Sequence, residues 1–217
     1  MKNNMLWVKV AALIAAIIVI SVLSTAIYCH TAATNLYLAA THEQEEGRLL
    51  EAQRGYEQAL GYNPWHADAA YQLATIFRDR HNPEEALRLM KRAVSLNRHN
   101  ADYYLGLGYL YLHQFKDKKS AEINFKKAYK ENSKNYYACI ILGQLAEEKS
   151  QPKTAISFYE TAIDSEPKLI LAYKRMAELY GKEGMAPLAQ KYWDDVREIN
   201  PRDKDARAHL SMGRVAR

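Results

Sequence analysis

The chain has 217 residues, 48% of them hydrophobic, which suits either one sizeable core or an array of small stacked units. Thirty basic and 25 acidic residues leave a formal net charge of +5, too weak to argue for a nucleic-acid partner. Only six prolines and nine glycines occur, and Ala, Leu, Glu, Lys and Tyr are abundant, so we predict an all-α protein.

The longest uncharged stretch lies near the N-terminus, at residues 10–28, after a short tail of residues 1–9. Its sequence is VAALIAAIIVISVLSTAIY. At about 1.5 Å per residue, a helix of this length nearly matches a hydrocarbon core of about 30 Å. Trp7 and Tyr28 stand at its ends, where aromatic rings favour the headgroup layers. We therefore predict a transmembrane anchor over residues 10–28.

The charges that flank this stretch predict its orientation. Lys2 and Lys9 precede it, whereas residues 29–47 contain no Lys or Arg. Because positive flanks tend to stay inside, we expect a single-pass protein with a cytoplasmic N-terminus. The rest of the chain is then extracytoplasmic, and periplasmic if the source is a Gram-negative bacterium.

A cleaved signal peptide is the alternative interpretation of the same stretch. Ser24, Thr25 and Ala26 offer small residues at the cleavage positions, and cleavage there would leave Ile27 as the mature N-terminus. The apolar run is longer than a usual signal-peptide core, which favours the anchor. Tyr28 is too bulky to precede a lipid-modified cysteine at Cys29. Cys29 and Cys139 are far apart in the sequence and form no CxxC motif, so we expect free thiols.

The remainder of the chain repeats itself with a period of about 34 residues. A small residue recurs at intervals of 34, 35, 34 and 34 residues, at Ala52, Ala86, Ala121, Ala155 and Ala189. Seven residues after each stands another, at Ala59, Ala93, Ala128, Ala162 and Val196. A large residue lies between them, at Tyr56, Met90, Phe125, Tyr159 and Trp193. Small residues let two helices approach closely, and we expect each large residue to fill the gap against the next helix pair.

This template resembles the tetratricopeptide repeat, a helix-turn-helix unit of 34 residues. The resemblance covers residues 33–203 and implies a right-handed solenoid of helical hairpins. It divides the chain into five units, at residues 33–66, 67–100, 101–135, 136–169 and 170–203. Residues 29–32 would form a short tether, and residues 204–217 a C-terminal capping helix. An unrelated helical bundle is the alternative, but five matching columns favour the repeat.

Three prolines, Pro64, Pro167 and Pro201, are expected to end the second helix of their units. The chain departs from the family pattern at Arg98 and Ser133, which replace such a proline, and at Glu43 and Ala146, which stand where a bulky residue is usual. No glycine or proline interrupts the link between the anchor and the first repeat, so a continuous helix is allowed there. The short polar residues Thr31, Thr34 and Asn35 mark the place where we expect any interruption.

No pattern of catalytic residues occurs in the sequence. His42 and Glu46 share one helix face, but the second histidine of a zinc-protease motif is missing. No Gly-rich phosphate loop or GxSxG elbow occurs. We therefore predict no enzyme, no cofactor and no metal, and we reject a helical enzyme that uses His42 and Glu46. Lysines 116, 118, 119, 126, 127, 130 and 134 form a basic stripe that is either a solvated face or a contact for acidic lipids or partners.

In the tetratricopeptide repeat family, the first helix of each unit lines the inner surface with its second, fifth, ninth and twelfth residues. Carried onto this chain, the resemblance implies a partner-binding face made of Tyr37, Tyr71, Thr75, Arg78, Asp102, Leu105, Tyr109, Leu112, Tyr137, Ile140, Gln144, Glu147 and Lys174. Aromatic and aliphatic residues dominate the middle of this set, as in many protein interfaces. We choose Tyr71, Tyr109 and Tyr137 as its anchors, although each could instead stack within the core.

These features predict a membrane-anchored scaffold that binds a protein or peptide partner and performs no chemistry. The expected partner is a subunit of a membrane or envelope complex, with the protein acting as assembly factor or accessory subunit. We expect no nucleic acid and no small-molecule substrate. The alternative is a cytosolic-facing co-chaperone that binds a C-terminal peptide. Such a clamp requires Lys and Asn on the inner face, where this chain has Tyr37 and Thr41, or Tyr71 and Thr75.

Overall fold

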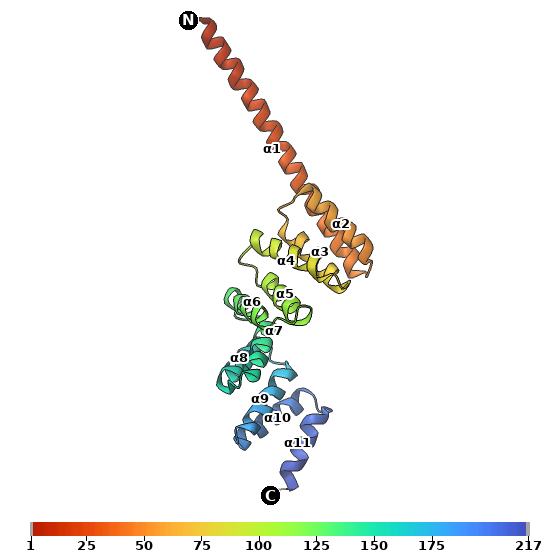
Figure 1. Ribbon diagram of the computed structural model, residues 1–217, viewed down its shortest axis with the longest axis vertical. Coiled ribbons are helices and arrows are strands. Elements are labelled where there is room, and N and C mark those ends of the chain that lie inside the picture. The colour runs from red at the N-terminus through yellow and green to blue at the C-terminus, as the bar shows by residue number, and fades with distance from the viewer. Residues whose placement is uncertain (1, 216–217) are drawn as a thin grey trace. The chain divides into compact units, whose positions relative to one another are not determined.

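The computed structural model describes residues 2–215, with side chains for residues 10–209. All secondary structure in this part is helical, which confirms the all-α prediction (Figure 1). The helices are α1 (Lys2–Glu45), α2 (Leu49–Tyr62), α3 (Ala67–Asp79), α4 (Pro83–Leu96), α5 (Ala101–His113), α6 (Lys118–Glu131), α7 (Tyr136–Glu148), α8 (Pro152–Ser165), α9 (Ile170–Lys182), α10 (Ala186–Ile199) and α11 (Lys204–Val215). The chain forms two compact units, unit 1 up to Arg98 and unit 2 from His99, and each is described by itself.

Helix α1 runs without a break through the residues at which the sequence allowed an interruption. The hydroxyl of Thr31 donates to the carbonyl of Ile27 at 2.9 Å, and that of Thr34 donates to the carbonyl of His30 at 2.9 Å. Because these side chains bond to the preceding turn of the same helix, they do not compete with its backbone hydrogen bonds. Residues 29–32 are thus helical, and no non-helical tether separates the apolar run from the first repeat.

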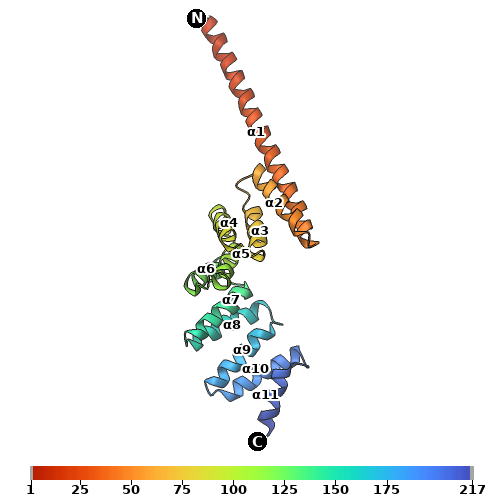
Figure 2. The same cartoon turned by 45° about the vertical axis from the view of Figure 1, so that its right-hand side comes forward.

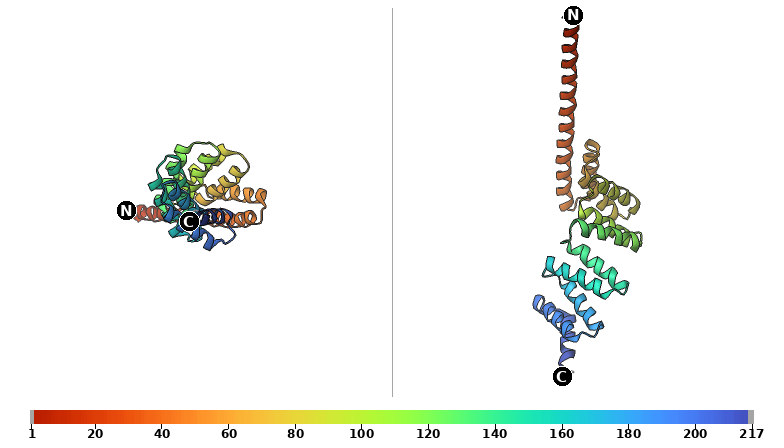
Figure 3. Two further views of the ribbon diagram at one scale, coloured as in Figure 1. Left: turned by 90° about the horizontal axis from the view of Figure 1, so that it is seen from below. Right: turned by 90° about the vertical axis from the view of Figure 1, so that its left-hand side faces the viewer.

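The two halves of α1 have different surroundings. The large apolar side chains of residues 10–28 are 38 to 67% exposed, and this half stands clear of the rest of unit 1 in Figure 3. Ala33 and Ala40, in the other half, are buried where α2 packs along α1. By length and composition, α1 can cross a membrane. A signal sequence near an N-terminus passes the same test.

Side-chain caps begin most of the helices that follow. Helices α3, α5, α7 and α9 start at the first residue of the second, third, fourth and fifth repeats that the resemblance implied, whereas the first repeat begins within α1. The His66 ring accepts from the Ala69 amide at 3.2 Å, and the Asn135 side chain accepts from the Ala138 amide at 3.1 Å. Such caps satisfy amides that lack a partner in the first turn. Helix α6, the second helix of its hairpin in unit 2, has the same kind of cap, since the Asp117 side chain accepts from the Ser120 amide at 3.0 Å.

Proline marks both ends of the second helices. Pro64, Pro167 and Pro201 each lie two residues beyond the end of α2, α8 and α10, as expected. Pro83 and Pro152 stand at the other end, as the first residues of α4 and α8. Proline fits the first turn, where its missing amide hydrogen has no helical partner.

Both columns of small residues are buried. Four of the five residues in the first column are fully inaccessible, and Ala189 is nearly so; all five of the second column are inaccessible. The large residues between them are also buried. In unit 2 the hairpins follow one another as similar layers (Figure 2). The repeat that the sequence predicted is therefore present as a repeating core.

Unit 2 shows how each large residue connects two hairpins. Within its own hairpin, the Phe125 ring covers Gly108, because a Cβ on Gly108 would lie 2.6 Å from that ring. Phe125 also shares a cluster with Leu142 and Leu145 of the next hairpin. The expected contact with the next helix pair is thus confirmed, and the same ring also holds its own pair together.

The last hairpin of unit 2 repeats this arrangement against α11. Trp193 of α10 shares a cluster with Ala206, which is fully buried. The Trp193 ring also stacks on His209 with the ring centroids 4.3 Å apart. Helix α11 therefore covers the apolar face at the end of the repeats; residues 216–217 of the predicted cap lie outside the described residues.

Candidate protein-binding surface

The first helices of unit 2, α5, α7 and α9, carry the open part of the predicted partner-binding face. Tyr137 is 51% exposed, and Leu105, Tyr109 and Leu112 are half-buried. Burial raises the pKa of Tyr109, and the nearby Tyr137 raises it further. Tyr109 lies on α5 and Tyr137 on α7, the first helices of successive hairpins. Together with the two leucines they form a patch of apolar and aromatic side chains with phenol groups, a composition found in the centres of protein interfaces.

Tyr109 belongs partly to the core. Its ring meets Phe125 edge to face with the centroids 5.4 Å apart, and it stacks on His113 at 5.8 Å. It also packs against the cluster around Phe125. Since aromatic pairs of this kind contribute to stability, Tyr109 supports the fold as well as the surface.

Two residues of the predicted face lie below the surface. Ile140 is only 6% exposed and belongs to the cluster around Tyr159. Thr75, on α3 in unit 1, is 9% exposed, and its hydroxyl donates to the carbonyl of Gln72 at 2.7 Å. Their positions on the helices matched the family pattern, but neighbouring helices cover them, so we no longer expect them to contact a partner.

Two charged residues of the predicted face hold the fold. Glu147 accepts a hydrogen bond of 2.5 Å from the hydroxyl of the buried Tyr159, whose pKa is raised by burial and then by this carboxylate. The Lys174 ammonium lies 2.8 Å from Asp203 and 2.7 Å from Asp205. It holds the pKa of the Asp203 carboxyl below its usual range. The family pattern could not predict these three partners, because they lie on other helices or turns.

The remaining predicted residues have side chains that are exposed or half-buried. Gln144 is half-buried on α7, and Asp102 is exposed on the first turn of α5. In unit 1, the Tyr37 ring lies between the rings of Tyr56 and His66, at centroid distances of 5.8 and 4.8 Å. Tyr71 is half-buried on α3.

Arg78, also on α3 in unit 1, pairs with its neighbour Asp79 at 2.8 Å. This pair is a surface contact between adjacent residues, which contributes little to stability. The guanidinium therefore remains available to an acidic partner.

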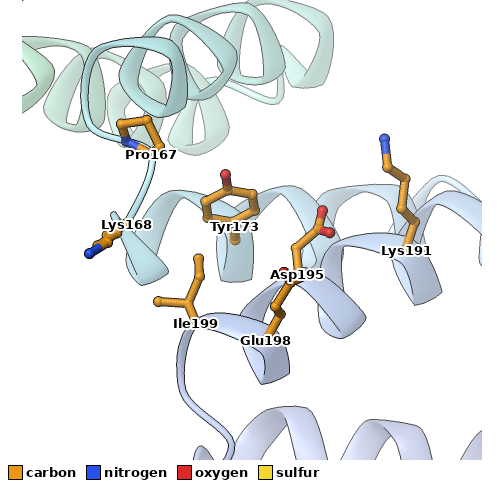
Figure 4. Close-up of a pocket in the computed structure, with 7 residues that line it drawn as sticks. All are labelled: Pro167, Lys168, Tyr173, Lys191, Asp195, Glu198 and Ile199. Carbon is orange, nitrogen blue, oxygen red and sulfur yellow. The ribbon is translucent and has the colours of Figure 1, made fainter.

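A hollow of about 620 Å³ lies in unit 2 beside the turn between α8 and α9 (Figure 4). Its lining comes from that turn and from α9 and α10, and consists of Pro167, Lys168, Tyr173, Lys191, Asp195, Glu198 and Ile199. Burial raises the pKa of the Asp195 carboxyl, and Lys191 opposes this effect. Both signs of charge line the hollow in equal number, so it selects neither a cation nor an anion.

The two charge features that the sequence raised are surface pairs. His42 and Glu46 lie 3.3 Å apart and are exposed, and the residues described contain no group of three His, Cys, Asp or Glu side chains that could hold a metal ion. In the basic stripe, Lys118 pairs with Glu148 at 2.6 Å and Lys126 pairs with Glu122 at 3.0 Å. These lysines are therefore partly neutralised within the repeats.

The fold and this surface define a class of protein: a helical-repeat protein whose hairpins share a repeating core and whose first helices leave a patch open to another polypeptide. Residues 71–136 and 136–169 match two models described as tetratricopeptide repeat. Residues 71–169 therefore belong to the tetratricopeptide repeat family. Neither model describes a catalytic domain. Among curated proteins no relative matches the chain.

Solved structures with the same fold support this assignment. MamA is 24% identical, with a TM-score of 0.64 over 75% of this chain and 94% of its own. YrrB, described as a TPR protein with an unusual peptide-binding site, is 19% identical, with a TM-score of 0.63 over 82% of this chain and 90% of its own. PilW, described as a widely conserved type IV pilus biogenesis factor, is 16% identical, with a TM-score of 0.67 over 82% of this chain and 86% of its own. At these identities the likeness shows the fold.

Proposed function

We propose that this protein is a membrane-anchored scaffold that holds a protein or peptide partner on the first helices of its repeats. It works by binding alone, as an assembly factor or accessory subunit of a membrane or envelope complex. The N-terminus is cytoplasmic and the repeats are extracytoplasmic. The bilayer is reached through residues 10–28.

The observation that carries this proposal is the continuity of α1. One unbroken helix contains the exposed apolar run and then, from Ala33 onward, packs on α2 as part of the first repeat. Exposing so many large apolar side chains to water is unfavourable, whereas a bilayer removes that cost. A helix without a joint keeps the first repeat at the membrane surface, so its partner must also come to the membrane.

The open patch on unit 2 supports the binding part of the proposal. Tyr137, Leu105 and Leu112 offer apolar area, and the half-buried Gln144 lies on the same first-helix face as a hydrogen-bonding group. Solved structures with this fold include one described as having a peptide-binding site and one described as a pilus biogenesis factor. Both descriptions fit a binding role, and the second fits assembly in a cell envelope.

Reporter fusions at the C-terminus test the orientation. Alkaline phosphatase is active only after export, and a green fluorescent protein exported by the general secretory route does not fluoresce. We expect the phosphatase fusion to be active in the membrane fraction and the fluorescent-protein fusion to be dark. Fluorescence without phosphatase activity would place the repeats in the cytosol and favour the co-chaperone alternative. Activity in the soluble fraction would indicate a cleaved signal peptide.

Photocrosslinking tests the binding face. A benzoylphenylalanine at Tyr137 lies on the proposed face, and the same residue at Ile123 on α6 is a matched control, because the two positions are 51 and 48% exposed. In native membranes we expect one discrete adduct from position 137 and none from position 123. Equal adducts from both positions, or none from position 137, would contradict the proposed face.

A further inference from the structure

The turn between α2 and α3 in unit 1 exposes large aromatic side chains that the proposed function does not use. Trp65 is 75% exposed and Tyr62, the last residue of α2, is 44% exposed. Pro64 fixes one backbone angle of the turn, and the Asn63 side chain accepts from the Trp65 amide at 3.0 Å. An ordered turn thus presents a tryptophan to the outside.

This turn lies beside the end of the apolar run. Helix α2 runs back along α1, so its last residue returns to the level of Tyr28, and the Tyr28 and Tyr62 rings meet with centroids 6.4 Å apart. His66, at the far end of the turn, contacts the ring of Tyr37. Nine residues separate Tyr28 from Tyr37, about 14 Å along a helix. The turn from Tyr62 to His66 therefore occupies the first 14 Å or so beyond the apolar run.

The surroundings of the turn are nearly free of charge. Residues 10–41 of α1 contain no Asp, Glu, Lys or Arg, and neither do residues 58–67, which form the end of α2 and the turn. The Arg92 guanidinium donates to the Pro64 carbonyl at 2.5 Å. Burial lowers the pKa of the His66 ring, and the nearby Asp68 carboxylate raises it by less. An edge with exposed aromatic rings, one guanidinium and a single carboxylate at its far end is poorly suited to bulk water. It matches a headgroup layer, where Trp and Tyr rings gather and arginine meets phosphate.

We propose that the turn Tyr62–His66 is a second membrane contact, with the Trp65 ring in the headgroup layer of the leaflet through which α1 emerges. This inference rests on the proposed anchor. A headgroup layer extends roughly 5 to 8 Å beyond the hydrocarbon core, so part of the turn falls within it even when α1 is upright. Tilt of α1 toward the turn brings Trp65 deeper.

The consequence is that the first repeat has a fixed face toward the bilayer. A single spanning helix leaves rotation about its own axis free, whereas a second contact beside it removes that freedom. The contact is the same whichever side of the membrane carries the repeats, because it depends only on the end of the apolar run. The first repeat then has one orientation relative to the membrane plane.

Tryptophan fluorescence of the full chain in vesicles tests this contact. The reporter variant carries Trp7→Phe and Trp193→Phe, so that Trp65 is the remaining tryptophan; Phe is acceptable at position 193 because Phe125 occupies the equivalent place in another repeat. The control variant adds Trp65→Phe and Leu50→Trp. Leu50 is 54% exposed at the opposite end of α2, about 20 Å farther along that helix.

Both variants are reconstituted in vesicles of phosphatidylcholine and phosphatidylglycerol that carry bromine near the ester end of their acyl chains. We expect the Trp65 emission to shift to shorter wavelength and to be quenched by the brominated lipid, with protection from aqueous acrylamide. The control tryptophan at position 50 should emit at the longer wavelength typical of a water-exposed ring and should remain accessible to acrylamide. Flotation of the vesicles shows independently that α1 is inserted.

The two ideas fail in different ways. If the protein does not float with the vesicles, the anchor itself is wrong. If it floats but Trp65 behaves like the control, the anchor stands and the second contact is overturned. Equal quenching of both tryptophans would also overturn it, since the whole hairpin would then lie on the bilayer without a specific turn contact.

Discussion

The apolar run of unit 1 and the repeat core of unit 2 differ in the exposure of their apolar side chains. In unit 1 the longest apolar segment, residues 10–28, is exposed on one helix, whereas in unit 2 the largest apolar side chains, such as Phe125 and Tyr159, are fully buried between hairpins. Both regions are apolar in composition. The difference teaches that period, and not hydrophobicity, separates a lipid-facing helix from a repeat helix: the first is apolar all round, and the second only on one side.

Arginine in the exposed run has the largest expected effect. Ile17→Arg combined with Ile20→Arg places two charges near the middle of the run, at about 2.5 to 3.5 kcal/mol each. We expect the protein to leave the membrane on carbonate extraction while its helical content in unit 2 stays unchanged. The matched control is Leu38→Arg with Leu50→Arg, two exposed residues of unit 1 outside the run. Retention of the first variant in the membrane would show that the run does not span it.

The two described tryptophans sharpen the comparison, because one is exposed in unit 1 and the other is buried in unit 2. Trp193→Ala removes the contacts with Ala206 and His209, and we expect it to lower the free energy of unfolding by about 3 to 5 kcal/mol. Trp65→Ala should change it by less than about 0.5 kcal/mol. Urea unfolding followed by circular dichroism in detergent measures both. Similar losses would mean that Trp65 belongs to a core.

The two cysteines give a pH-dependent form of the same contrast. Burial raises the pKa of the Cys139 thiol in unit 2 from 9.0 to about 11. The folded state favours the neutral thiol, so Cys139 contributes up to about 3 kcal/mol to the free energy of unfolding. This contribution is complete below pH 9 and is lost as the pH rises to about 11. We expect Cys139→Ala to lose less stability than the parent chain between pH 8 and pH 10.5. Cys29→Ala, on α1, should behave like the parent. Equal alkaline losses in all three would remove Cys139 as the cause.

Three glycines provide the smallest effects. A Cβ on Gly143 would lie 2.5 Å from the buried Tyr159 ring, and one on Gly55 would lie 2.7 Å from the Cβ of Ala40. Overpacking then outweighs the gain in helix propensity, so each Gly→Ala change should destabilise by about 1 to 2 kcal/mol. Gly61 has nothing within 4 Å, and Gly61→Ala should stabilise by up to about 1 kcal/mol. Thermal midpoints test this; a stabilising Gly143→Ala would show that the ring can move away.

Much of the fold could be predicted from particular residues. The alanine columns gave the hairpins, since a small residue every 34 positions has a direct packing meaning, and Pro64 and Pro167 marked the turns. The sequence could not decide whether α1 is continuous, because Thr31 and Thr34 can either interrupt a helix or bond within it. In the structure their hydroxyls donate to carbonyls of the preceding turn of α1.

The candidate surface was harder to predict. Ile140 and Tyr137 are both at positions that the family pattern assigns to the inner face, yet one is buried and the other is exposed. Glu147 and Lys174 are held by Tyr159 and by Asp203 and Asp205, which belong to other helices or turns. A helix register places a residue on a face, but the neighbouring hairpin decides whether it is covered.

The sequence by itself determined the helical repeat and the apolar segment before it, because the first depends on regular spacing along the chain and the second on composition. Only the tertiary structure decided which inner residues remain open, which charges are already paired, and that Trp65 returns to the end of the apolar run. Those properties arise from contacts between residues far apart in the chain, such as Tyr28 with Tyr62, and no local pattern specifies them.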